Sequence, residues 1–239
     1  MDPERALYKR ILLKLSGEVL GGESGEGFDW EVIDRICGSI KTLRSAGVQV
    51  AVVVGGGNIL RGRQVPRERL DRNSADYMGM LATVMNGLVM LRHLQRIGLN
   101  ARLFSALEVP QVADLYRIDD VKSALEKGEV AILAGGTGHP HFTTDTGAAL
   151  RAAELGADVV LKGTNVEGVY TSDPHKDPDA RLIKRISYKE VIEKGLGVMD
   201  LTAVSLCMNA GIPVKVFSIL DPSNIVRVCF DESIGTLIE

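Results

Sequence analysis

Residues 51–62 read AVVVGGGNILRG and indicate the fold class, because an apolar run passes directly into three consecutive glycines. A short apolar run that ends in glycines is typical of a buried strand. Glycine lets backbone N–H groups approach an anion closely, so a strand followed by a glycine-rich loop is also a common way to hold phosphate. The stretch therefore predicts a buried strand with a phosphate loop after it.

Two well-known phosphate loops can be compared with this stretch. The dinucleotide fingerprint requires G-x-G-x-x-G, but counting from Gly55 places Leu60 at the third glycine position. The ATPase loop requires Lys and then Ser or Thr after its last glycine, and neither follows Gly62. Because both single-loop solutions fail, a phosphate site here has to be assembled from several loops.

Short apolar runs recur along the chain and alternate with longer stretches of helical spacing. We expect strands at residues 10–15, 48–54, 100–106, 130–134 and 158–162, and closing strands at 214–217, 225–230 and 236–238. We expect helices at residues 29–45, 74–97, 145–155, 187–194 and 201–210, the third with an N-cap at Thr144 or Asp145. This alternation predicts an α/β fold in which helices cover both faces of a mainly parallel sheet. With no linker or repeat visible, residues 1–239 are expected to form one domain.

The composition is typical of a globular protein with an aliphatic core. The 239 residues are 45% hydrophobic but only 5% aromatic, and the net charge is -3 without a block of basic residues. A role on nucleic acid or at a membrane surface is therefore not expected. Neither a signal peptide nor a membrane span is indicated, and the three scattered cysteines indicate neither a disulfide framework nor a zinc site. We expect a cytoplasmic protein with reduced thiols.

Four predicted strands run into glycine-rich segments. These segments are KLSGEVLGG from Lys14, the stretch quoted above, AGGTGHPHFTTDTG at 134–147 and LKGTNVEGVYTSD at 161–173. In a parallel sheet with helical crossovers all four lie at the carboxyl edge, where such folds bind ligands. The alternative is that the glycines only turn the chain. The charged and hydroxyl side chains among them favour a composite phosphate site.

Lys14 and Lys162 carry the clearest charge signal, since each stands near the end of an apolar strand beside a glycine turn. Two lysines on separate parallel strands would flank a phosphoryl group in transfer and stabilise the charge on its oxygens. Asp145 would orient the lysines or magnesium-bound water. The alternatives are a lysine that extends into water at the sheet edge and an aspartate that only caps a helix.

Further polar residues extend this constellation. Arg61 adds positive charge after the triple glycine, and Asp173 is a second candidate for organising a metal or the lysines. No Cys–His or Ser–His–Asp arrangement indicates a covalent nucleophile. The pair His139 and His141 lies in a predicted loop, where it is expected to line a site rather than to bind metal.

Six segments, taken in order, resemble the bacterial-type uridylate (UMP) kinases, a branch of the amino acid kinase superfamily. They are YKRILLKLSGE, VVVGGGNILRG, ADYMGMLATVMNGL, AGGTGHPHFTTDTGAALRAAE, ADVVLKGTNVEGVYTSDP and VMDLTA. The resemblance extends from about Tyr8 to Ile238. MGMLATVMN separates this branch from the carbamate, aspartate and acetylglutamate kinases.

The resemblance implies a three-layer αβα sandwich, the amino acid kinase fold, whose N-terminal part mainly binds UMP and whose C-terminal part mainly binds ATP. It implies transfer of the γ-phosphoryl group of ATP to UMP, with Mg²⁺ bound through the ATP phosphates and not directly by the protein. It also implies a homohexamer in pyrimidine nucleotide synthesis, inhibited by UTP and in many bacteria activated by GTP. The stretch 22–27 matches the region linked to GTP activation.

The resemblance also assigns residues by position, beside the charge argument above. Catalysis would depend on Lys14, Arg61, Asp145 and Lys162. ATP would be held by Lys14, Leu15, Ser16, Gly17, Gly57, Arg61, Thr164, Asn165, Tyr170 and Asp173, with Tyr170 near the adenine. UMP would be held by Gly56, Asp76, Thr137, Gly138, His139, Pro140, His141, Phe142, Thr143 and Thr144, with Asp76 at the ribose.

Two positions depart from the family pattern, which usually has Asn in place of His139 and an aromatic residue in place of His141. Both lie in the segment assigned to UMP, so they bear on the details of nucleotide contact. Two alternative functions stay open: another acyl-phosphate-forming enzyme of the amino acid kinase family, or a nucleotide-binding protein without turnover on the same fold. The failed fingerprint argues against a dinucleotide-dependent dehydrogenase.

Overall fold

The computed structural model describes residues 6–60, 70–172, 174 and 176–239. Within these residues, a central sheet has the strand order β4-β3-β5-β2-β1-β6-β10-β11-β9. Its strands are β1 Arg10–Leu15, β2 Gln49–Val54, β3 Ala101–Ser105, β4 Asp114–Leu115, β5 Val130–Ala134, β6 Val159–Thr164, β9 Arg185–Ile186, β10 Val214–Ser218 and β11 Thr236–Ile238. Of the strand pairs in this sheet, only β10 with β11 is antiparallel. A separate antiparallel pair joins β7 Val169–Tyr170 to β8 Leu182–Ile183.

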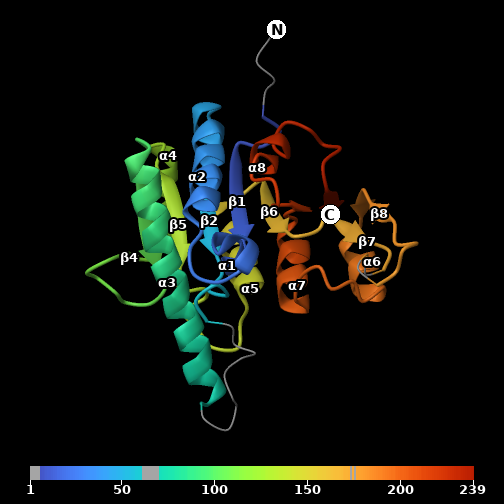
Figure 1. The fold of residues 1–239 in the computed structure, drawn as a ribbon, viewed down its shortest axis with the longest axis horizontal. Helices are drawn as coiled ribbons and strands as arrows, with labels where there is room; N and C mark the ends of the chain where they lie inside the picture. The colour runs from blue at the N-terminus through green and yellow to red at the C-terminus, as the bar shows by residue number, and fades with distance from the viewer. Residues whose placement is uncertain (1–5, 61–69, 173, 175) are drawn as a thin grey trace.

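Helices cover both faces of the sheet (Figure 1), which confirms the predicted three-layer α/β fold. One apolar cluster joins the sheet to α2 Trp30–Ser45, α3 Arg72–Arg96 and α8 Asn224–Arg227. The other joins the opposite face to α4 Ile118–Glu126, α5 Thr144–Leu155, α6 Tyr188–Glu193 and α7 Leu201–Ala210. A short α1 Gly17–Leu20 and a 3-10 turn η1 Gly22–Ser24 follow β1.

The four strands that precede the glycine-rich segments are neighbours in the middle of the sheet, in the order β5-β2-β1-β6. Their pairings are parallel, so their carboxyl ends meet at one edge as predicted. Side chains alternate between the two faces along a strand. Leu13 accordingly lies in the cluster beneath α2 and α3, whereas Leu12 lies in the cluster beneath α5. Lys14 lies on the same face as Leu12, toward α5.

Most predicted helices and strands are confirmed, but the strand predicted at residues 225–230 is wrong. This segment begins with α8, and its buried residues are Ile225, Val228 and Cys229. Their spacing of three and then one is helical, and Ile225 N–H and Val226 N–H donate to the carbonyls of Pro222 and Ser223. The β-branched residues favoured a strand, but burial against α2 determined the conformation.

Sequence periodicity also missed α4, although its acidic first turn and its buried Val121, Ala124 and Leu125 follow the helical pattern.

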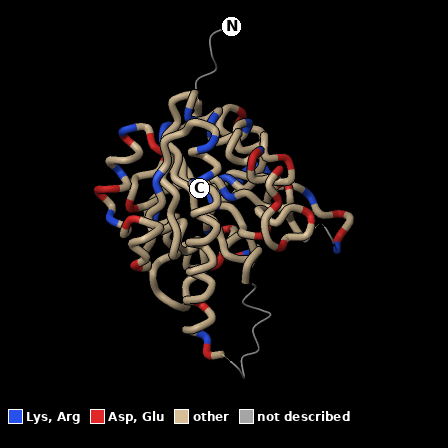
Figure 2. The backbone as a smooth tube through the Cα atoms, turned by 60° about the vertical axis from the view of Figure 1, so that its left-hand side comes forward, with Lys and Arg blue, Asp and Glu red and all other residues tan. Residues whose placement is uncertain are grey.

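No described helix has the length and apolar character needed to cross a membrane. Figure 2 shows basic and acidic residues scattered together over the outer elements. The three cysteines are buried and unpaired.

Candidate active site

The first turn of α5 places the central carboxylate of the site. The N-cap is Thr143, whose hydroxyl oxygen accepts hydrogen bonds from the N–H groups of Asp145 and Thr146 at 3.1 Å each. The prediction of Thr144 or Asp145 as the cap was therefore wrong by one or two residues. Because Thr143 caps the helix, the side chain of Asp145 is left for other partners.

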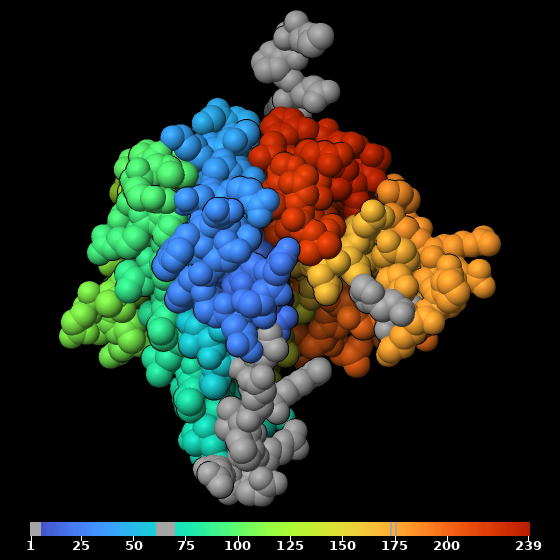
Figure 3. Space-filling model, viewed as in Figure 1, coloured from blue at the N-terminus to red at the C-terminus, as the bar shows by residue number. Residues whose placement is uncertain are grey.

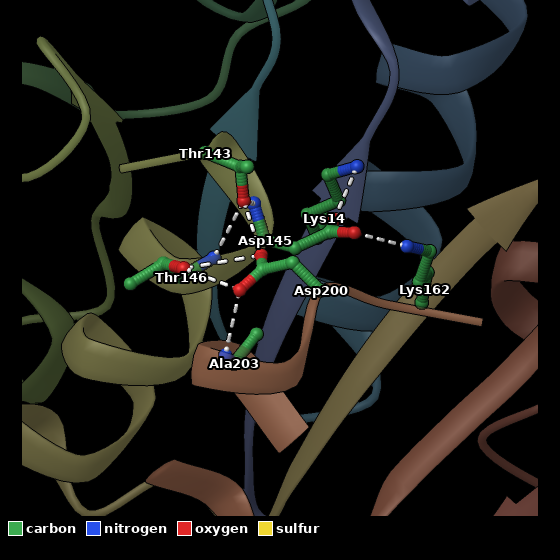
Figure 4. Close-up of polar contacts among 7 residues, drawn as sticks. All are labelled: Lys14, Thr143, Asp145, Thr146, Lys162, Asp200 and Ala203. Atoms are coloured by element: carbon green, nitrogen blue, oxygen red, sulfur yellow. Dashed lines mark hydrogen bonds and ion pairs between the residues drawn. The ribbon is translucent and has the colours of Figure 1, made fainter. Parts of the chain in front are cut away.

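Asp145 lies between the two lysines that the sequence singled out (Figure 4). Lys14 and Lys162 are directly paired in the register of β1 and β6, so their side chains point to the same face. Lys14 Nζ lies 2.6 Å from Asp145 Oδ1, and Lys162 Nζ donates to Asp145 Oδ2. Side chains from three separate elements therefore form one buried ionic cluster, which brings together three of the residues that the sequence analysis assigned to catalysis.

The charges in this cluster shift the pKa values of its members. Burial acts to raise the pKa of Asp145, but attraction to Lys14 and Lys162 outweighs it and the pKa is lowered. Burial lowers the pKa of Lys162, and repulsion from Lys14 adds to this effect, while Asp145 opposes it. The aspartate therefore stays ionised at neutral pH, which keeps two cations close together without a phosphate.

Asp200 makes polar contacts that the sequence did not predict, although the residue lies in the segment VMDLTA. It caps α7 by accepting a hydrogen bond from Ala203 N–H at 3.0 Å. It also accepts hydrogen bonds from the hydroxyl groups of Thr143 and Thr146 (Figure 4). Asp200 thus ties the start of α5 to the start of α7. The available signal was an Asp before a helical apolar pattern, which predicts the cap but not the contact with α5.

A small cavity lies beside the cluster, at the carboxyl ends of β2 and β5. Its lining includes seven of the ten residues assigned to UMP binding: Gly56, Asp76, Thr137, His139, Phe142, Thr143 and Thr144. Met80 and Thr83 of α3 complete one wall. Gly138, Pro140 and His141 belong to the same loop but do not line the cavity. The residues of the resemblance thus gather around one hollow, on the Thr144 side of the cluster.

A larger cavity of about 1560 Å³ lies on the other side of the cluster. Lys14, Ser16, Lys162, Thr164 and Asn165 line it, together with residues 21–26 and the segment after β10. Figure 3 shows the blue 17–32 segment, the gold segment after β6 and the red segment after β10 adjoining one another on this face. The volume exceeds that of a typical small-molecule pocket, so the cavity is large enough for a nucleoside triphosphate.

Close backbone contact joins the first two glycine-rich segments. A Cβ atom at Gly17 would lie 2.4 Å from the Gly55 carbonyl oxygen and 2.5 Å from Gly57 N, and one at Gly56 would lie 2.8 Å from the Gly79 carbonyl oxygen. Such distances leave no room for a side chain. Glycine is therefore required at these positions for the loop to lie between α1 and α3.

The segment assigned to UMP contains a strained backbone position. His141 is the only non-glycine residue with a positive φ, 72°, among those that the structure describes. Its N–H group donates to Asp76 Oδ2 at 2.7 Å. A non-glycine residue in this conformation costs on the order of 1–3 kcal/mol and is often found at functional sites. Asp76 therefore already holds the loop through one carboxylate oxygen.

Several sequence-assigned residues are not placed in these cavities. Arg61 and Asp173 lie outside the described residues. Leu15 is fully buried in the core. Tyr170 lies on β7, where its hydroxyl donates to Glu167 at 3.4 Å, and it does not line the larger cavity. The contact of Tyr170 with adenine stays a prediction.

The arrangement fits phosphoryl transfer between ligands in the two cavities. Thr144 lines one cavity and its neighbour Asp145 binds the lysines that line the other, so the lysines stand where the cavities meet. No group of three or more potential His, Cys, Asp or Glu metal ligands occurs among the described residues. Both Asp145 oxygens face lysines, so neither of them is left to bind a metal ion.

Comparison with known proteins shows the family to which the chain belongs. The model of the amino acid kinase family matches residues 9–218. UMP kinase from Bacillus anthracis is 33% identical, with a TM-score of 0.94 over 97% of this chain and 96% of that one. UMP kinase from Ureaplasma parvum is 35% identical, with a TM-score of 0.91 over 97% and 98% of the two chains. Uridylate kinase from Archaeoglobus fulgidus is 29% identical, with a TM-score of 0.72 over 96% and 99%. The chain therefore belongs to the amino acid kinase family.

Proposed function

We propose that this chain is a uridylate kinase, which transfers the γ-phosphoryl group of ATP to UMP and releases UDP and ADP in pyrimidine nucleotide synthesis. The observation that carries the proposal is the cluster of Lys14, Asp145 and Lys162 at the meeting point of two cavities. Similarity to UMP kinases over nearly the whole chain supports UMP and ATP as the two substrates.

The reaction is a direct in-line displacement. An oxygen of the UMP phosphate forms a bond to the γ-phosphorus while the bond from that phosphorus to the β–γ bridging oxygen breaks, and the electron pair leaves with ADP. The attacking oxygen is already ionised at neutral pH, so no strong general base is needed. Catalysis therefore depends on alignment and on stabilisation of charge.

Charge stabilisation is the part that Lys14 and Lys162 would provide. Both ammonium groups are nearly buried, and electrostatic interactions are stronger in such surroundings than in water. Asp145 holds the two groups together before the phosphates arrive, so little rearrangement is needed on binding. Magnesium bound to the ATP phosphates would neutralise further negative charge.

The two substrates would occupy opposite sides of this cluster. UMP would lie in the smaller cavity, with its ribose at Asp76 and its phosphate at Gly56 and Thr144. ATP would lie in the larger cavity, with its phosphates at Ser16 and the lysines and its nucleoside at Thr164 and Asn165. Gly57 lines the smaller cavity, yet it touches the segment that carries Ser16, so it would contact both the UMP phosphate and the ATP phosphates.

A homohexamer, UTP inhibition and GTP activation belong to the same proposal. An exposed apolar face on α3 supports assembly with further copies of the chain. Its exposed residues are Tyr77, Met78, Leu81 and Met85, with 43–52% of their surface accessible. Their spacing places them on one side of the helix, and contiguous apolar patches of this kind mark protein contacts.

The burial of Cys37, Cys207 and Cys229 as free thiols supports the cytoplasm as the compartment.

One experiment tests the activity. ADP release from ATP is measured with UMP, CMP, dUMP, aspartate and carbamate in turn, each with and without GTP. We expect selective turnover with UMP. Activity with only a carboxylate or carbamate acceptor would overturn the assignment of UMP, and the absence of ADP release with every acceptor would favour a nucleotide-binding protein without turnover.

A further inference from the structure

We propose that Asn58 and Asn86 form a positioning pair, which fixes the glycine loop at residues 55–58 between the two substrate cavities. The proposal rests on the proposed function for the identity of the substrates. Neither residue lines either of these two cavities, so both would act through the backbone that they hold.

Asn86 uses both ends of its amide group in the interior of the protein. Its side chain is completely buried. Its Nδ2 group donates to the Gly55 carbonyl oxygen at 2.7 Å and to Asn58 Oδ1 at 2.7 Å. Its Oδ1 atom accepts from Asn58 Nδ2 at 3.1 Å. The two amides therefore bind each other reciprocally, and Asn86 anchors the first glycine of the loop to α3.

Asn58 extends the same network to a third segment. Its Nδ2 group also donates to the Gly27 carbonyl oxygen at 2.7 Å, and the backbone carbonyl oxygen of Asn58 accepts from Gly27 N–H at 3.0 Å. The residues that flank Gly27 line the larger cavity; they are residues 21–26 before it and Phe28 after it. Gly56 and Gly57, between the two anchored residues, line the smaller one. The pair therefore connects the backbone walls of both cavities.

The chemistry of the pair favours positioning over simple packing. Two buried amides are costly unless their donors and acceptors are satisfied, and an apolar pair would fill the same space without that cost. Hydrogen bonds, however, are directional. They fix the orientation of the Gly55 peptide, and through it the backbone of Gly56 and Gly57, whose N–H groups would contact the phosphates. A displacement of about 1 Å in such groups costs roughly a hundredfold in rate.

The test compares Asn86→Ala, Asn58→Ala and the double variant in steady-state kinetics with ATP and UMP. We expect kcat to fall roughly ten- to a hundredfold in each single variant, with smaller changes in both KM values, because alignment is lost and not binding. We expect the double variant to be no slower than the slower single variant, because either change breaks the same pair.

Tyr188→Phe is the matched control. Tyr188 is buried, and its hydroxyl donates to the Ile212 carbonyl oxygen on another part of the molecule, so this variant loses a buried hydrogen bond without touching the loop. If the asparagine variants lower the melting temperature as Tyr188→Phe does and keep kcat within twofold of it, the pair is only structural and the proposal fails. Additive losses in the double variant would also overturn it.

Two further arms keep the test decisive. If Asn86→Ala does not fold, the volume-conserving apolar change Asn86→Leu replaces it, since that change fills the space, removes the donors to Gly55 and Asn58 and is expected to lower kcat in the same way. If the unmodified protein turns over another acceptor and not UMP, the proposed function fails, but the same variants are compared with that acceptor. The loss of kcat then still decides the role of the pair.

Discussion

Lys14 and Lys162 are direct partners in the parallel register of β1 and β6, and Asp145 lies against both of them. Two like charges on adjacent strands repel each other unless an anion separates them. The carboxylate supplies that anion in the free protein, and transferring phosphoryl oxygens would share the role during the reaction.

Lys14→Ala is expected to lower kcat by roughly a hundred- to a thousandfold, because it removes a buried cation from the developing charge. The pair of Lys162 with Asp145 remains, so the fold should be kept. Initial rates at saturating ATP and UMP measure the loss, and circular dichroism checks the fold. Lys189→Ala removes an exposed lysine on α6 and should leave kcat unchanged. A near-normal kcat in Lys14→Ala would refute the catalytic role.

Asp76→Ala is expected mainly to raise the KM for UMP, by roughly tenfold or about 1.4 kcal/mol. The change removes the acceptor for His141 N–H and the group assigned to the ribose. The KM for ATP should change little, because Asp76 lines only the smaller cavity. Substrate titrations of both nucleotides measure the difference, and an unchanged KM for UMP would contradict the assignment.

The contribution of Asp145 to stability should depend on pH. Its pKa is lower in the folded protein than the ordinary value of 3.8. Its stabilising effect is therefore fully present above about pH 5 and is lost as the pH falls through the folded-state pKa. Asp145→Asn should cost roughly 3–5 kcal/mol at neutral pH, because it leaves two buried lysines without their partner. Urea unfolding at several pH values should show the gap to the unmodified protein narrowing below pH 4, whereas a constant gap would argue against the pKa shift.

Asp200→Ala should lower both stability and turnover. It removes the cap of α7 and the acceptor of two hydroxyl groups at the start of α5, which costs about 1–3 kcal/mol. Ser187→Ala removes the cap of α6, which lines neither of the two cavities beside the lysines, so it should cost stability but not turnover. Unfolding midpoints and kcat are measured for both variants. If both lose turnover equally, Asp200 has no special connection to the site.

The cysteines should resist alkylation in the native protein. Burial raises the pKa of Cys37 and Cys229 to about 12 and that of Cys207 to about 11, so little reactive thiolate exists at neutral pH. Mass spectrometry after iodoacetamide treatment should find unmodified thiols in buffer and full modification in concentrated urea. Rapid labelling of one cysteine without denaturant would show that its surroundings open.

Local patterns in the sequence predicted those parts of the molecule that depend on near neighbours. Apolar runs and helical spacing located the central strands and the long helices, and parallel topology brought the glycine-rich segments to one edge. The same reasoning placed Lys14 and Lys162 near each other, because both stand near the ends of strands. Their one-to-one register required the structure.

Contacts between distant polar residues could not be predicted in this way. Asn86 lies in a segment that reads as an ordinary apolar helix, and only the path of the chain brings Asn58 and Gly55 against it. The capping role of Asp200 is local, but its contact with Thr146 is not. The strand prediction at residues 225–230 was wrong for a related reason. Strand propensity is a local property, whereas burial against α2 is not.

The order of the central strands has a consequence for synthesis on the ribosome. β2 is the next strand of the chain after β1, so the two can pair early, but the other neighbour of β1, β6, follows only after α5. A nascent chain that ends before residue 159 therefore carries Lys14 without Lys162, and one edge of β1 is unpaired. Such an intermediate has an open strand edge available for aggregation, and it lacks one of the two cations proposed to bind the substrate phosphates. The late arrival of β6 closes that edge and completes the lysine pair in the same step.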